Sequence, residues 1–151
     1  MPELTPNCTV TFESRQIMQG EEEKSVISVP AYRTNKNGIE YIYYTVYYDS
    51  ENECENREIV KIKNENCIEL IRNGFLKSKM TFIQNETTVT DYQSPAGHLY
   101  ISITTENLKT VITDDKITIN MKYKINLDDD VEVLIYFKFT ADSNIDEKEV
   151  I

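Results

Sequence analysis

Apolar and polar residues alternate without interruption over one stretch of this chain, Lys116–Leu127. Every second position from Ile117 onward is Ile, Met, Tyr or Leu, and the positions between them are Lys, Thr or Asn. Successive side chains of a β-strand point to opposite faces, so this period predicts a strand with one buried face. Similar reasoning predicts strands over Cys8–Met18, Ser25–Thr34 and Gly38–Asp49, and no segment shows the period of a helix.

Short turn motifs between these runs determine which strand residues oppose each other. We chose loop lengths that keep one apolar face through consecutive hairpins. The expected loops are Arg72-Asn73-Gly74, Gln84-Asn85, Pro95-Ala96-Gly97, Glu106-Asn107, Asp114-Asp115 and Asp128-Asp129-Asp130. The expected oppositions are Leu70 to Leu76, Met80 to Val89, Asp91 to Ile101, Ile112 to Ile117 and Ile125 to Val133. Over Gly38–Asp49 both faces are apolar, so the buried face cannot be read there.

With these loops a single apolar face runs through seven consecutive strands from Val60 to Phe139. The three upstream candidates bring the total to about ten. An all-β, antiparallel up-and-down barrel of about 8–10 strands is the predicted fold, because closure removes the edges of an open sheet. An open two-sheet sandwich is the alternative. Residues 1–141 form the single expected domain, and residues 142–151 an acidic tail.

The charge balance and the cysteines limit the possible partners and compartment. The formal net charge is −10, whereas nucleic acid or an anionic membrane surface requires a basic patch. The first residues lack the basic and apolar regions of a signal peptide, and no apolar run reaches the length of a membrane span. Cys8, Cys54 and Cys67 are an odd number without metal-ligand spacing, which favours a reducing cytoplasmic setting.

The order IELIRNGF, MTF, TDYQSPAGHLYISITT and ITINMKYKI resembles the YwiB-like proteins. These are small bacterial proteins of uncharacterised function with a calycin-like, lipocalin-related β-barrel. The similarity spans about Thr9 to Thr140 and is strongest between Glu69 and Thr105. The resemblance implies the barrel and a bacterial cytoplasmic setting, and it implies no catalytic residues. The chain has no Trp, so the Gly-x-Trp signature of secreted lipocalins is absent and no specific lipocalin ligand is implied.

Catalytic and metal-binding constellations are missing from the sequence. His98 is the single histidine, and the expected loop places it at the surface rather than beside a nucleophile. Zinc requires three or four Cys, His or acidic ligands, and Asp128–Asp130 does not match a calcium loop. We therefore expect no enzyme activity, no catalytic residues, no metal and no cofactor.

A few polar residues are expected inside or at the mouth of the barrel. The chosen register points Asp91 inward beside Ser78, with Tyr92 and Tyr123 nearby. A buried carboxylate must be paired or hydrogen-bonded, so these residues could be the polar part of a ligand site. Alternatively, Asp91 accepts hydrogen bonds from the backbone of the adjoining turn. Arg72 could neutralise an acidic ligand at the barrel mouth or could be a solvated turn residue.

Two functions remain open from the sequence alone. The barrel could bind a small, largely apolar ligand in its interior, since eight strands enclose just enough space for one. It could instead be a structural or protein-interaction domain whose bulky side chains fill the interior. The second function predicts no pocket and allows a monomer, or a homodimer through the Tyr-rich strand or the strand of Pro30. Sequence gives the direction of a side chain but not the volume of the interior.

Overall fold

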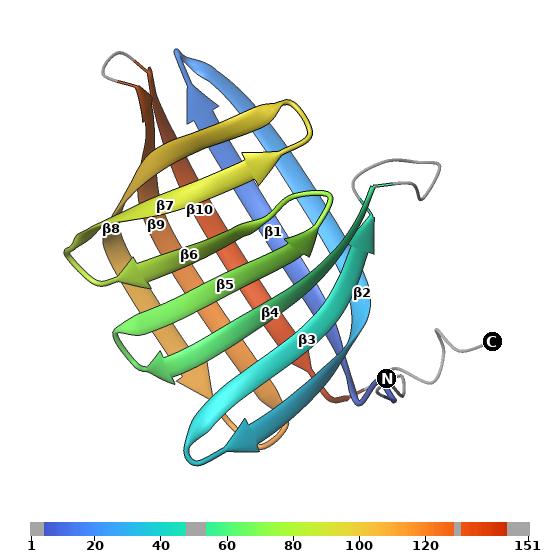
Figure 1. Ribbon diagram of the computed structural model, residues 1–151. Helices are drawn as coiled ribbons and strands as arrows, with labels where there is room; N and C mark the ends of the chain where they lie inside the picture. The colour runs from blue at the N-terminus through green and yellow to red at the C-terminus, as the bar shows by residue number, and fades with distance from the viewer. Residues whose placement is uncertain (1–4, 48–53, 129–130, 145–151) are drawn as a thin grey trace.

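The computed structural model describes residues 5–47, 54–128 and 131–144 and consists of ten β-strands (Figure 1). They are β1 (Cys8–Met18), β2 (Glu21–Lys36), β3 (Ile39–Tyr47), β4 (Glu55–Asn64), β5 (Cys67–Gly74), β6 (Ser78–Ile83), β7 (Thr87–Ser94), β8 (Gly97–Ile112), β9 (Lys116–Asp128) and β10 (Val131–Asp142). The part of the chain that the structure describes holds no helix long and apolar enough to cross a membrane.

The strands form one antiparallel sheet in the order β6-β5-β4-β3-β2-β1-β10-β9-β8-β7. Successive strands are neighbours in the sheet except β6 and β7, which lie at its two ends, and β1 pairs with β10 in the middle of the order. Among the described residues, β6 and β7 share no ladder and are joined by one bridge between Lys77 and Gln93. A hydrogen bond of 2.6 Å from the Thr88 hydroxyl to the Thr81 carbonyl also joins them. The predicted up-and-down barrel of about 8–10 strands is therefore confirmed, with ten strands and nearly complete closure.

Two long strands turn the sheet into two crossing layers. In Figure 1, β3 to β7 cross in front of β1, β9 and β10, and β2 and β8 pass from one layer to the other. Residues Glu21–Ala31 of β2 pair with β1, and Ala31–Lys36 pair with β3. The pairing with β3 begins directly after Pro30, which has no N–H to donate to a ladder. Pro30 therefore opposes Thr9 of β1 and has no ladder partner in the described part of β3.

The registers of the C-terminal hairpins agree with the sequence analysis. Ile125 opposes Val133 and Ile112 opposes Ile117, as expected. Asp129 and Asp130 of the predicted loop lie outside the described residues. The prediction of a turn at Glu106-Asn107 is wrong, because β8 continues through it with a β-bulge between Thr105 and Asn107. The bulge adds one residue, so the other set of alternate positions of β8 faces inward beyond it. The expected turn would have placed the same residues inward.

Two other loops have different lengths from those predicted. Leu70 opposes Met80 rather than Leu76, because Arg72 and Ser78 are the last opposed pair and the loop between them is residues 73–77 rather than 72–74. The shift is even, so the inward-facing set of both strands is unchanged. The predicted opposition of Met80 to Val89 is also wrong, since β6 and β7 are not laddered and Val89 is exposed.

One continuous core fills the barrel. Its largest fully buried side chains include Phe82, Phe139, Ile42, Ile68, Ile103, Ile117 and Ile119. The buried positions of β3 are Glu40, Ile42, Tyr44 and Val46, which settles the face that the sequence left open. Arg33 and Glu40 form an ion pair of 3.0 Å near the β2–β3 turn. Arg33 also donates to the Thr113 carbonyl at 2.8 Å, so it joins two turns at this closed end of the barrel.

Candidate functional site

The opposite end of the barrel is more open and holds most of the predicted site residues. It is the end of the β1–β2, β5–β6 and β7–β8 turns (Figure 1). Met18, Phe75 and Leu99 lie beside these turns with 40–44% of their surface exposed. Arg72, near the end of β5, and Ser78, at the start of β6, oppose each other here and face inward. We call this region the open end.

Glu58, Arg72 and Tyr44 form a polar cluster inside the open end. The Glu58 carboxylate lies 3.4 Å from Arg72 Nε and accepts a hydrogen bond of 3.0 Å from the Tyr44 hydroxyl. The Glu58 side chain is only 2% exposed and that of Arg72 is 23% exposed. A buried carboxylate needs such partners, because burying an isolated charge is costly. The cluster is therefore close to neutral and does not present an unpaired charge to the interior.

Asn56 completes this cluster and has a structural role. Its side chain accepts a hydrogen bond of 2.8 Å from the Leu76 N–H and donates one of 3.1 Å to the Leu76 carbonyl. These bonds hold the β5–β6 connection against β4. The sequence analysis missed Asn56 and Glu58, although they alternate with Val60 and Ile62 and so share the inward face of β4. That alternation is the signal that could have found them.

Tyr123 lies deeper in the barrel and packs edge-on against Phe82, with ring centroids 4.8 Å apart. Burial raises the pKa of Tyr123 to about 12, although the nearby charge of Arg72 lowers it in part. The phenol is thus protonated at neutral pH. Tyr92 is partly buried and packs against the core from β7. Ser78 is buried, and its hydroxyl has no hydrogen-bond partner among the residues that the structure describes.

The prediction that Asp91 faces the interior is wrong. Ser94 opposes Gly97, so the β7–β8 loop has two residues rather than three, and the inward positions of β7 shift by one. Thr90 takes the buried position, and the Asp91 side chain is 46% exposed. Its carboxylate contacts His98 Nε2 across the two strands. The structure therefore brings Arg72, Ser78, Tyr92 and Tyr123 to the inside and leaves Asp91 outside.

The cavity inside the barrel is small. It has a volume of about 30 Å³ and is lined by Arg72, Tyr123 and apolar side chains of the core. A volume of this size holds about one water molecule. Small-molecule sites usually measure hundreds of Å³, so side chains would have to move before an apolar ligand could enter.

The cysteines and acidic residues do not assemble a reactive centre in the described residues. Among these residues there is no group of three or more His, Cys, Asp or Glu that could hold a metal ion. Burial is the main influence that raises the pKa of the Cys8 and Cys67 thiols. The reactive form of cysteine is the thiolate, so these thiols are poor nucleophiles at neutral pH.

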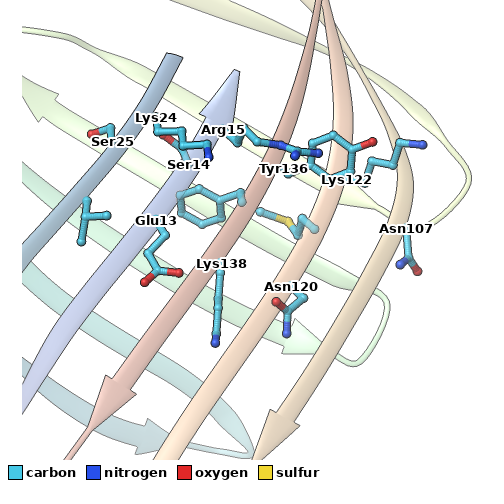
Figure 2. A pocket seen from close by; sticks show the side chains of 13 residues that line it. Glu13, Ser14, Arg15, Lys24, Ser25, Asn107, Asn120, Lys122, Tyr136 and Lys138 are labelled. Atoms are coloured by element: carbon cyan, nitrogen blue, oxygen red, sulfur yellow. The ribbon is translucent and has the colours of Figure 1, made fainter. Parts of the chain in front are cut away.

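A larger concavity lies on the outside of the barrel. It measures about 470 Å³ and crosses β2, β1, β10, β9 and β8 on their outer face (Figure 2). Four cationic side chains line it, those of Arg15, Lys24, Lys122 and Lys138, together with the carboxylate of Glu13. We call it the outer groove. Its residues belong to strands far apart along the chain, and no sequence motif connects them.

Comparison with known proteins agrees with this architecture. The chain is 23% identical to the uncharacterised β-barrel protein YwiB of Bacillus subtilis (strain 168) over 138 residues, 89% of this chain and 91% of that protein. The crystal structure of YwiB from Bacillus subtilis superposes with a TM-score of 0.81 at 18% identity, covering 91% of this chain and 92% of the other. Residues 10–136 match the model of a domain of unknown function, DUF1934. With its ten-stranded barrel and this match over most of its length, the chain belongs to the DUF1934 family.

Proposed function

We propose that this protein is a non-enzymatic interaction module whose packed barrel is a rigid scaffold and whose binding surface lies outside. The observation that carries the proposal is the contrast between the two cavities. The interior leaves about 30 Å³, whereas the outer groove measures about 470 Å³. Only the second value falls within the usual range of ligand sites, about 300–1,000 Å³.

The competing function is the binding of a small, largely apolar ligand in the barrel. The exposed apolar side chains of the open end and the polar cluster beneath them favour it. The volume of the interior opposes it, because Phe82, Phe139 and the neighbouring Ile side chains already fill the space that such a ligand would need. The barrel would have to expand before binding, and that would expose a close-packed core.

Native mass spectrometry of the purified full chain separates the two functions. We expect the mass of the chain alone, and no lipid in an organic extract of the protein. A Phe82→Ala variant is the positive control, because an enlarged apolar cavity binds benzene or xenon. Benzene is expected to raise the melting temperature of the variant and not that of the wild type. A copurified apolar molecule in the wild type would overturn the packed-barrel proposal.

The compartment and the oligomeric state are part of the same proposal. Three free cysteines, Cys8, Cys54 and Cys67, support a cytoplasmic location, because reducing conditions preserve thiols. The protein acts as a monomer, or as a homodimer through β3 or through the free edge of β2. Size-exclusion chromatography with light scattering distinguishes these states. A substitution of Val26, which is 66% exposed on β2, would weaken a dimer formed at that edge.

A further inference from the structure

We propose that the outer groove binds an extended acidic segment of a partner protein. This inference rests on the proposed interaction function and assigns it a surface and a class of partner. The groove lies on the outer face of the layer that contains β1, β9 and β10, away from the barrel interior (Figure 2).

The strand registers order the floor of the groove into rows across the sheet. In one row Lys24 opposes Arg15, Arg15 opposes Tyr136, and Tyr136 opposes Lys122. The next row contains Glu13, Lys138 and Asn120, in the order of the strands. Figure 2 shows the first row above the second, with side chains from β2, β1, β10 and β9. These residues come from opposite ends of the chain and meet because β1 pairs with β10.

Tyr136 is the centre of the first row. The Arg15 guanidinium lies 4.3 Å from the centroid of its ring, and Lys122 Nζ lies 5.6 Å from it. Both distances are within the range of cation–π attraction. The aromatic ring therefore keeps two cations close together on the floor of the groove, where their mutual repulsion would otherwise separate them.

Two of the four cations are available to a partner. Arg15 is paired with Glu22 at 3.2 Å and Lys122 with Glu106 at 3.3 Å. Lys24 and Lys138 form no ion pair among the described residues. Lys24 directly opposes Arg15 on the same face, and like charges in this position destabilise a sheet. An acidic partner would relieve this repulsion, which supports a binding role for the row.

The spacing of the row fits an extended chain. Neighbouring strands lie about 4.8 Å apart, so Lys24 and Lys122, three strands apart, are separated by about 14 Å. In an extended chain, residues i and i+4 point to the same side about 13 Å apart. Acidic side chains at alternate positions of a peptide that crosses the strands can therefore reach Lys24, the Arg15–Tyr136 pair and Lys122 in turn.

The charge of the whole chain narrows the class of partner. A net charge of −10 repels polyanions from most of the surface, so only the local arrangement in the groove can attract an acidic segment. Nucleic acid binding depends on neutralising many phosphates along the groove. The groove provides four cations, two of them already paired, and adds the amide side chains of Asn107 and Asn120. Such a surface suits a peptide with a few carboxylates better than a nucleic acid backbone.

Fluorescence anisotropy at low ionic strength tests the proposal with a labelled peptide in which Glu alternates with Ser. The full-length chain is expected to bind this peptide and not its counterpart with Gln in place of Glu. The double substitution Lys24→Glu and Lys138→Glu is expected to weaken binding about tenfold or more, since each reversal replaces an attraction with a repulsion. Lys36→Glu with Lys77→Glu is the matched control, because it changes the net charge equally on residues outside the groove.

Three results would overturn the inference. They are equal weakening by the control variant, tighter binding of a single-stranded oligonucleotide of the same charge, and no binding of the Glu peptide by the wild type. Circular dichroism and thermal unfolding of both variants establish that they are folded. None of these results depends on whether a ligand occupies the barrel interior. If the groove does not bind the peptide, native mass spectrometry still tests the packed-barrel proposal separately.

Discussion

Replacing Arg33 should lower the stability of the protein, because Arg33 pairs with Glu40 at the closed end of the barrel. Arg33 Nε and Nη2 donate to the two carboxylate oxygens of Glu40 at 3.1 and 3.0 Å. Their side chains are 14% and 10% exposed. Arg33→Ala would leave Glu40 charged and nearly buried, and breaking a buried pair in this way costs about 3–5 kcal/mol. We expect about 3 kcal/mol, because the pair retains some contact with water.

The loss should depend on pH. Burial acts to raise the pKa of Glu40, but hydrogen bonds from Arg33 and Asn35 and the charge of Arg33 hold the pKa below its usual value. A lowered folded-state pKa stabilises the fold above the unfolded value, about 4.3, and this contribution is lost as the pH falls through the folded value. In the variant, burial acts without Arg33 and the pKa of Glu40 rises. The difference in stability is therefore largest near pH 7 and shrinks towards about pH 4.

Urea denaturation at both pH values measures these differences as free energies of unfolding. Arg33→Ala combined with Glu40→Gln should recover part of the loss near pH 7, because a neutral amide is less costly to bury than a charge. Arg15→Ala is the control, since its pair with Glu22 is exposed and is expected to contribute about 1 kcal/mol or less. A loss that is independent of pH, or no recovery in the double variant, would refute the reasoning.

Four further predictions test other parts of the structure. Phe82→Ala should cost about 3–5 kcal/mol in urea denaturation, and a loss below about 1 kcal/mol would mean that the core is not close-packed there. Gly74→Ala should lower the free energy of unfolding by at least about 1 kcal/mol more than Gly20→Ala. Both glycines have a positive φ, but only at Gly74 would a Cβ meet a backbone carbonyl, at 2.3 Å. Equal losses in the two variants would contradict this reasoning. Asp91→Asn should change the free energy of unfolding by no more than about 0.5 kcal/mol, as expected for an exposed position. A large loss would indicate that the Asp91 carboxylate is buried. In a spectrophotometric titration the Tyr123 phenol should ionise only at about pH 12, and the disappearance of a high-pH step in Tyr123→Phe would identify it.

Local patterns were sufficient for much of the fold. Cys8–Met18 has the predicted bounds, and the predicted opposition of Ile125 to Val133 follows from alternation together with the chosen loop length. Asn37 and Gly38 form the turn between β2 and β3 with φ values of 55° and 85°, which favour these two residue types. Where the predicted loop lengths were wrong by an even number, as between β5 and β6, the buried face was still correct.

Asp91 shows where local patterns fail. Two-residue and three-residue loops both suit Ser94-Pro95-Ala96-Gly97, and a change of one residue moves every side chain of the strand to the other face. Burial of Thr90 decides between them, and that depends on contacts with distant strands. Glu58 was missed for a related reason, because its partner Tyr44 lies on a strand whose two faces are equally apolar in sequence.

The sequence by itself determined that this protein is an antiparallel barrel of about ten strands, because the period of two and the turn residues act over a few neighbouring positions. Only the tertiary structure decided what the barrel contains and what it presents. The volume of the cavity among the core side chains, about 30 Å³, depends on how side chains from all layers interlock. The outer groove exists because the pairing of β1 with β10 places Arg15 beside Tyr136. This pairing of the first strand with the last creates the neighbourhood, and no short-range pattern in the chain encodes it.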